Sequence, residues 1–119
     1  MGDLSDPDLE RDLLHLREVY RPKLLGKLAE LDGQLRRARE ERPAKQQLED
    51  ARQLAHTLMG TSGSYGLDQV STELARIEEQ LERLLEGAMP DPAAAWTAIE
   101  QALGQARTRA AGPAAGAAP

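Results

Sequence analysis

The strongest constraint on the fold is the spacing of apolar residues in the second half of the chain. Apolar side chains recur there in steps of three and four residues, at Leu67, Val70, Leu74, Ile77, Leu81 and Leu84. That spacing puts all six on one face of an α-helix. A helix with one apolar face must bury it against other elements, so the pattern predicts packed helices.

Shorter apolar stripes at the same spacing predict further helices. A short first helix is expected to begin at Ser5, Asp6 and Pro7, where a capping side chain precedes a proline. It is expected to break or kink at Pro22, because proline removes a backbone donor. The apolar residues that follow are Leu24, Leu28, Leu31 and Leu35, then Leu48, Ala51, Ala55 and Leu58, and last Trp96, Ile99, Leu103 and Ala106.

Proline and glycine mark the expected boundaries between these helices. One helix is expected to end near Pro43 and the next to begin about Ala44. The glycines between positions 63 and 66 are expected to form a turn. After the sequence GAMPDP, Asp91 is predicted to cap the last helix, with Pro92 at its first position.

The length and the few aromatic residues complete the fold prediction. With 119 residues the chain is long enough for one domain. It has no phenylalanine, so leucine and alanine must build the core, which suits helices better than a sheet. Residues 1–111 are therefore predicted to form an all-α, antiparallel up-down four-helix bundle with a short additional N-terminal helix. Residues 112–119, GPAAGAAP, are predicted to be a flexible tail or linker.

Charge and composition exclude several classes of function. The net charge is −5, so we expect no nucleic-acid partner. No apolar run of about 18 residues could span a membrane, and the acidic N-terminus does not have the pattern of a secretory signal. The chain has no cysteine for a disulfide, a thiolate metal site or a nucleophile. A cytoplasmic monomer without bound metal is expected.

One histidine is predicted to face solvent beside glycine. At about 100° per residue, His56 lies on the side of its helix away from Ala55 and Leu58. Arg52, Met59 and Gly60 lie on the same side of the helix as the His56 ring. A glycine inside a helix weakens it by roughly 1 kcal/mol relative to alanine. Gly60 therefore suggests that another macromolecule approaches the helix beside His56.

A neutral imidazole is a nucleophile near pH 7, and a carboxylate can hold its second nitrogen in the protonated form. Glu78 follows the core residue Ile77 and could lean toward His56 from the next helix. Glu73 and Glu79 are alternatives. The same acidic stretch could also be a solvated face with internal ion pairs.

These residues resemble the signature of the His-containing phosphotransfer (Hpt) domain family. The signature is a histidine, an apolar residue two positions later, commonly lysine and then glycine, a stretch of small residues, and a glycine ten positions after the histidine. In AHTLMGTSGSYGL these are His56, Leu58, Met59, Gly60 and Gly66, with the small stretch 61–65 between the last two. Some members also carry a glutamate 22 residues after the histidine, which is Glu78 here. The resemblance covers about residues 6–110.

The resemblance implies a phosphocarrier and not a catalyst. His56 would accept a phosphoryl group from a histidine kinase or a receiver aspartate and pass it to a response-regulator receiver domain. Glu78 would orient the ring, Gly60 would give access, and Gly63 and Gly66 would shape the turn. The domain would need no cofactor of its own, because the partner would supply magnesium. The resemblance does not decide whether this domain is a free-standing protein or part of a larger kinase.

One departure from the family pattern leaves two hypotheses. Met59 stands where the family commonly has lysine, so a positive charge near the phosphoryl group is missing. Arg52 could supply phosphoryl electrostatics instead, or could simply pair with Glu49. The first hypothesis is a phosphotransfer module. The alternative, favoured by Met59, is an Hpt-like module that docks a kinase or receiver without being phosphorylated.

Other sites are less well supported. His15 is expected to be structural, at the surface or partly buried. Metal-binding bundles use Glu-x-x-His pairs on two helices, but Gln53 stands three residues before His56, so no metal site is predicted. The glycine-rich stretch GTSGSYG lacks the Lys-Ser/Thr of a nucleotide-binding loop.

Overall fold

The computed structural model describes residues 7–40, 45–87 and 90–112. These residues form four helices: α1 (Pro7–Glu40), α2 (Lys45–Ser64), α3 (Asp68–Glu86) and α4 (Pro92–Ala111). The all-α prediction is confirmed. The proposed boundaries at Ser5 and Asp6, at Pro43 and Ala44, and in the tail 113–119 lie outside the described residues.

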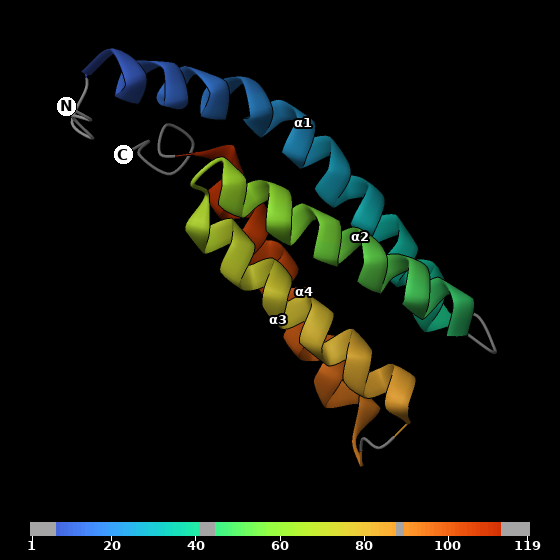
Figure 1. The fold of residues 1–119 in the computed structure, drawn as a ribbon. Helices are drawn as coiled ribbons and strands as arrows, with labels where there is room; N and C mark the ends of the chain where they lie inside the picture. The colour runs from blue at the N-terminus through green and yellow to red at the C-terminus, as the bar shows by residue number, and fades with distance from the viewer. Residues whose placement is uncertain (1–6, 41–44, 88–89, 113–119) are drawn as a thin grey trace, which may run out of the picture.

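The four helices pack as a bundle in which successive helices run in opposite directions (Figure 1). α2 packs against α1 and α3, and α4 packs against α3 and α1, so the helices form a ring in chain order. The seam between α2 and α3 therefore lies opposite the seam between α4 and α1. Of these two seams, α2–α3 is the more closely packed.

The core follows the apolar stripes predicted from the sequence. The α3 stripe from Val70 to Leu81 is fully buried or nearly so, and Leu67 lies at its end. α2 contributes two alanines and one leucine to the core, and α4 is likewise rich in small residues. Burial of apolar side chains is the main stabilising contribution in such a bundle. The buried residues of α2 and α4 in this core are Ala51, Ala55, Leu58, Ile99, Ala102, Leu103, Ala106 and Ala110.

The prediction of a separate short N-terminal helix was wrong. α1 is one helix of 34 residues that continues through Pro22. A proline inside a helix costs roughly 3 kcal/mol because it removes one hydrogen bond and crowds the preceding turn. Here Tyr20 and Leu24 are buried on the two sides of the proline, and Arg21 donates hydrogen bonds to α4. These contacts hold the backbone helical across Pro22.

The first turns of α1 extend past the end of α2 (Figure 1). The apolar stripe of α1 continues into this part of the helix, where it leaves the core. Leu9, Leu13 and Leu16 are each about half exposed there. The apolar stripe is therefore continuous along α1, but only its part from Tyr20 onward packs into the bundle.

The ends of the other helices agree only in part with the boundaries predicted from capping residues, proline and glycine. Asp91 caps α4 as predicted, since its carboxylate accepts hydrogen bonds from the amides of Ala93 (3.1 Å) and Ala94 (3.4 Å). The turn after α2 is shorter than predicted, because α2 continues through Gly63 to Ser64. Gly66 alone adopts the left-handed conformation in that turn, with φ of 75°.

Candidate functional site

His56 lies near the middle of α2 with its ring directed to the surface. Its helical neighbour Ala55 is fully buried, whereas 55% of the His56 side chain is exposed. The periodicity of the apolar residues in α2 accounts for this difference, because the buried stripe turns the next position outward. The ring is thus accessible and makes no contribution to the core.

Glu78 of α3 contacts the His56 ring across the α2–α3 seam. The distance from His56 Nδ1 to Glu78 Oε2 is 2.8 Å, and the glutamate side chain is largely buried. Because an ionised carboxylate can only accept, Nδ1 is expected to carry the ring proton and to donate the hydrogen bond to Glu78. Nε2, on the other side of the ring, is then unprotonated in the neutral imidazole. The geometry therefore favours the tautomer protonated on Nδ1, in which the lone pair of Nε2 is free.

Arg52 lies one turn before His56 and is tied to two carboxylates. Its Nε donates to Glu49 at 2.7 Å, and its Nη1 lies 3.6 Å from the same Glu78 oxygen that His56 contacts. The hydrogen bond to Glu49 raises the pKa of Arg52, so the group stays positive. Arg52 thus joins the Glu78–His56 pair in one network, and its charge is shared with acidic partners.

The other two glutamates considered from the sequence do not reach the ring. Glu73 pairs with Arg76, and Glu79 pairs with Arg83, each within α3. The interpretation of this stretch as a solvated face with internal ion pairs holds for these two. Glu78 differs because it follows Ile77 at the edge of the buried seam.

The glycines near His56 have different surroundings. A Cβ atom added at Gly60 would meet no atom within 4 Å, so the surface one turn after His56 is open. A Cβ atom at Gly63 would lie 3.6 Å from Ser71 Oγ, an ordinary contact with α3. At Gly66 the positive φ disfavours a side chain, and an added Cβ atom would lie 2.6 Å from Arg17 Nη2, so the flexible end of Arg17 would have to shift.

One polar contact near the site was not predicted from the sequence. The Ser71 hydroxyl of α3 donates a hydrogen bond of 2.9 Å to the backbone carbonyl of Met59, three residues after His56. It fixes the register of the two helices close to the ring. The sequence carries no signal for it, because serine spacing does not reveal which carbonyl lies opposite. The Met59 side chain is partly buried and packs against the core.

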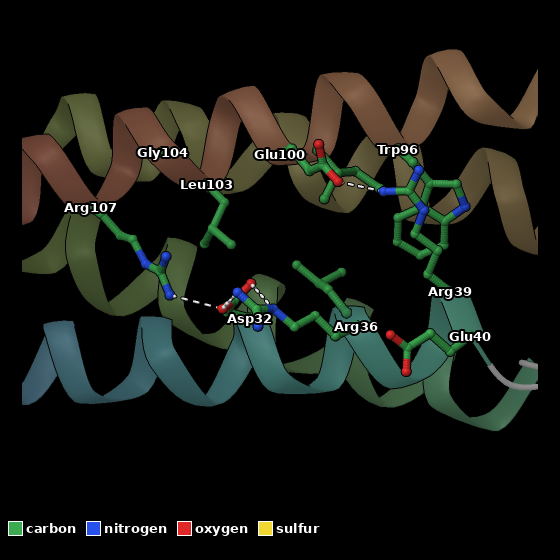
Figure 2. Close-up of a pocket in the computed structure, with 11 residues that line it drawn as sticks. Asp32, Arg36, Arg39, Glu40, Trp96, Glu100, Leu103, Gly104 and Arg107 are labelled. Atoms are coloured by element: carbon green, nitrogen blue, oxygen red, sulfur yellow. Dashed lines mark hydrogen bonds and ion pairs between the residues drawn. The ribbon is translucent and has the colours of Figure 1, made fainter.

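The opposite seam of the bundle carries a groove of different character. It has a volume of about 780 Å³ and lies between α1 and α4 (Figure 2). Asp32 contacts both Arg36 and Arg107 at 3.2 Å, and Arg39 reaches Glu100 from across the groove. Each of these three arginines is therefore paired with a carboxylate of the groove, either Asp32 or Glu100. His15 is exposed on the first part of α1, in neither of these regions.

Comparison with known proteins identifies one family. The sequence model of the Hpt domain matches residues 15–109, which include all four described helices in large part. Comparison with curated proteins and with solved structures gave no match. Among the described residues, no helix is both long enough and apolar enough to cross a membrane.

Proposed function

Because the chain belongs to the Hpt domain family, whose members carry phosphoryl groups on histidine in phosphorelays, we propose that His56 is its phosphoacceptor. The observation that carries this proposal is the 2.8 Å contact between His56 Nδ1 and Glu78 Oε2 on an otherwise exposed ring. A nucleophile for phosphoryl transfer needs a free lone pair, a fixed orientation and room for the donor. His56 meets the three requirements.

The proposed reaction forms one bond and breaks one. The lone pair of His56 Nε2 attacks the phosphorus of the donor, and the bond from phosphorus to the donor oxygen breaks. The electron pair leaves with that oxygen, on the aspartate of a receiver domain or the nucleotide of a kinase. The ring becomes positively charged while Nδ1 keeps its proton, and the Glu78 carboxylate stabilises that charge. The reverse sequence passes the group to a receiver aspartate.

The remaining residues of the site take supporting roles in this proposal. Gly60 leaves open surface for the partner domain to approach the ring. Gly66, with its positive φ, allows the turn that brings α3 beside α2, whereas a Cβ atom at Gly63 would make only an ordinary contact with α3. Arg52 is the nearest cation of the network. Because its charge is shared with Glu49 and Glu78, we assign it mainly to holding Glu78. The magnesium ion and the acceptor aspartate belong to the partner.

A second candidate function follows from Met59. It supplies no charge at the position where the family commonly has lysine, and its side chain packs against the core. A module that docks a kinase or receiver without accepting phosphate would tolerate this change. The intact network of His56, Glu78 and Arg52 favours phosphotransfer, since docking alone needs no selected tautomer.

The two functions are separated by incubating the protein with an active histidine kinase or a phosphorylated receiver domain and measuring acid-labile phosphate. The proposal expects labelling that His56→Gln abolishes and His15→Gln preserves, with both variants folded. His15 is the matched control because it is the other of the two histidines in the chain and is exposed. Binding of a receiver without labelling of the unmodified protein would instead support the docking function.

A further inference from the structure

A second cavity lies at the end of the bundle where α1, α3 and α4 meet. It has a volume of about 640 Å³, within the usual range for small-molecule sites. Arg17 and Arg21 of α1 line one side, and residues 66–70 line another. Thr108 and Arg109 of α4 complete it, together with Gly112 just after the helix. Gly66 belongs to the turn after α2, but the cavity is not lined by His56, Glu78 or Arg52, so it lies outside the network around His56.

The arginines of this cavity differ from most others in the protein. Among the described residues, eight arginines form an ion pair with an aspartate or glutamate. Arg17 and Arg109 are in no ion pair with a described carboxylate, and both line this cavity. In a chain of net charge −5, two such arginines at one place are unexpected unless something else neutralises them.

Hydrogen bonds hold two of the three arginines in position. Arg17 donates from Nε to the carbonyl of Tyr65 at 2.9 Å, which leaves its two terminal nitrogens available. Arg21 donates to the carbonyls of Arg109 (2.9 Å) and Ala110 (3.1 Å) and pairs with Glu18, so its role is to join α1 to α4. Of the two cavity arginines without an ion pair, Arg17 is thus held in position before any ligand binds, which lowers the entropic cost of binding, whereas no hydrogen bond of the described structure holds the Arg109 side chain.

The α1–α4 groove provides an internal contrast. Its arginines also point into a cavity between helices, but each is paired with Asp32 or Glu100 (Figure 2). In the cavity at the bundle end, the acidic residue of the lining is Asp68. Asp68 offsets one of the two charges contributed there by Arg17 and Arg109, so a net positive charge remains in the lining.

From the two arginines without an ion pair in one cavity, we propose that this end of the bundle binds a small phosphate-bearing anion. Guanidinium groups contact phosphate oxygens through paired N–H donors, and a bound phosphate would neutralise the positive charge that Asp68 leaves unbalanced. The first turn of α3 lies in the same lining and its preceding residue Leu67 forms no side-chain cap, although Asp68 in that turn already places one carboxylate at the helix dipole. The proposal does not depend on phosphotransfer at His56.

The test is a titration of the ¹⁵N-labelled full chain with inorganic pyrophosphate, followed by NMR in 0.1 M sodium chloride. Inorganic phosphate in a parallel titration distinguishes a site for a single phosphate from one that needs two. Saturable shifts are expected at the amides of residues 66–70 and at the side chains of Arg17 and Arg109. Shifts that do not saturate, or that spread over the whole surface, would overturn the proposal.

Arg109→Gln is the decisive variant, with Arg37→Gln as its control. The Arg109 side chain has no hydrogen bond in the described structure, and its carbonyl still accepts from Arg21 after the substitution. Arg37 is likewise in no described ion pair but lies away from the cavity. Arg109→Gln should weaken binding roughly tenfold or more, while Arg37→Gln leaves it unchanged. Equal weakening by both would show diffuse charge attraction and contradict a site.

Discussion

The α2–α3 seam and the α1–α4 seam lie on opposite sides of the same bundle and are held together differently. Between α2 and α3, packing is close, and a serine hydroxyl of α3 bonds to the α2 backbone beside Met59. Between α1 and α4, a groove of about 780 Å³ is bridged by partly exposed ion pairs (Figure 2). His56 and Glu78, whose contact needs a fixed distance, lie on the closely packed seam.

The difference shows where positional precision comes from in a small helical domain. Buried apolar contacts leave side chains few alternative positions, whereas exposed ion pairs add about 0–1 kcal/mol each and are weakened by salt. A hydrogen bond such as His56–Glu78 keeps its geometry only if the two backbones beneath it cannot move apart. We expect perturbation of the two seams to have unequal effects.

The largest effect is expected from a cavity in the shared core beneath the His56 seam. Leu74→Ala removes a fully buried side chain of α3 and should lower the free energy of unfolding by about 2–5 kcal/mol. Urea unfolding followed by circular dichroism measures it. If the free energy of unfolding falls by less than about 1 kcal/mol, the effect is no larger than that of an exposed ion pair. Packing would then not distinguish the α2–α3 seam from the α1–α4 seam.

Bulk placed beside His56 should block phosphotransfer without harming the fold. Gly60 and Gly104 both lie inside helices with open space around them, one near His56 and the other in the α1–α4 groove. Leucine at either position should stabilise its helix by up to roughly 1 kcal/mol. Gly60→Leu should slow transfer from a receiver by on the order of a hundredfold, because the partner can no longer reach the ring in line.

Gly104→Leu is the matched control for that experiment. It makes the same substitution on the opposite seam and should transfer at the parental rate. If the two variants slow transfer to the same degree, access at Gly60 is not what limits the reaction. If neither does, the partner approaches His56 from another side.

Removing the charge of Glu78 should change the tautomer of His56. It should also slow phosphoryl transfer by about tenfold, which is the effect expected for one hydrogen bond to a charged group at a half-exposed ring. Glu78→Gln keeps the size of the side chain, but an amide can donate as well as accept. Imidazole ¹⁵N chemical shifts report the tautomer. Glu79→Gln is the control, since Glu79 pairs with Arg83 and does not contact the ring; an equal effect of both variants would argue against a specific role for Glu78.

The smallest effect is expected on the α1–α4 side. Asp32→Asn removes the carboxylate that contacts Arg36 and Arg107. Its pairs are partly exposed, so the free energy of unfolding should fall by less than about 1 kcal/mol, and the loss should shrink in 0.5 M salt. Unfolding curves at two salt concentrations measure this. A loss comparable to that of Leu74→Ala would contradict the contrast between the seams.

Local sequence signals predicted much of the fold because they depend on neighbouring residues alone. The α3 stripe, the outward direction of His56 and the cap at Asp91 follow from helical spacing and capping chemistry. The break at Pro22 was wrong because burial of Tyr20 and Leu24, a tertiary effect, outweighs the local cost of proline. The helical conformation of Gly63 was missed for a related reason, since α2 continues along α3.

The site was predictable only where one helix or one family pattern determined it. The spacing of 22 residues suggested Glu78, and the structure then gave the 2.8 Å contact. The bond from Ser71 to Met59 and the convergence of Arg17 with Arg109 depend on how distant parts of the chain meet at one end of the bundle. No pattern within a single helix encodes such a meeting, so only the three-dimensional structure reveals it.

The central claim is that the α2–α3 seam holds Nδ1 of His56 against Glu78 and so presents Nε2 for phosphorylation. The most direct test is ³¹P and ¹⁵N NMR of the phosphorylated protein, in which the phosphorus couples to the nitrogen that it is bonded to. The account predicts a single phosphohistidine at position 56, bonded through Nε2, with Nδ1 still protonated. A phosphoryl group on Nδ1 of His56, or on His15, would contradict it.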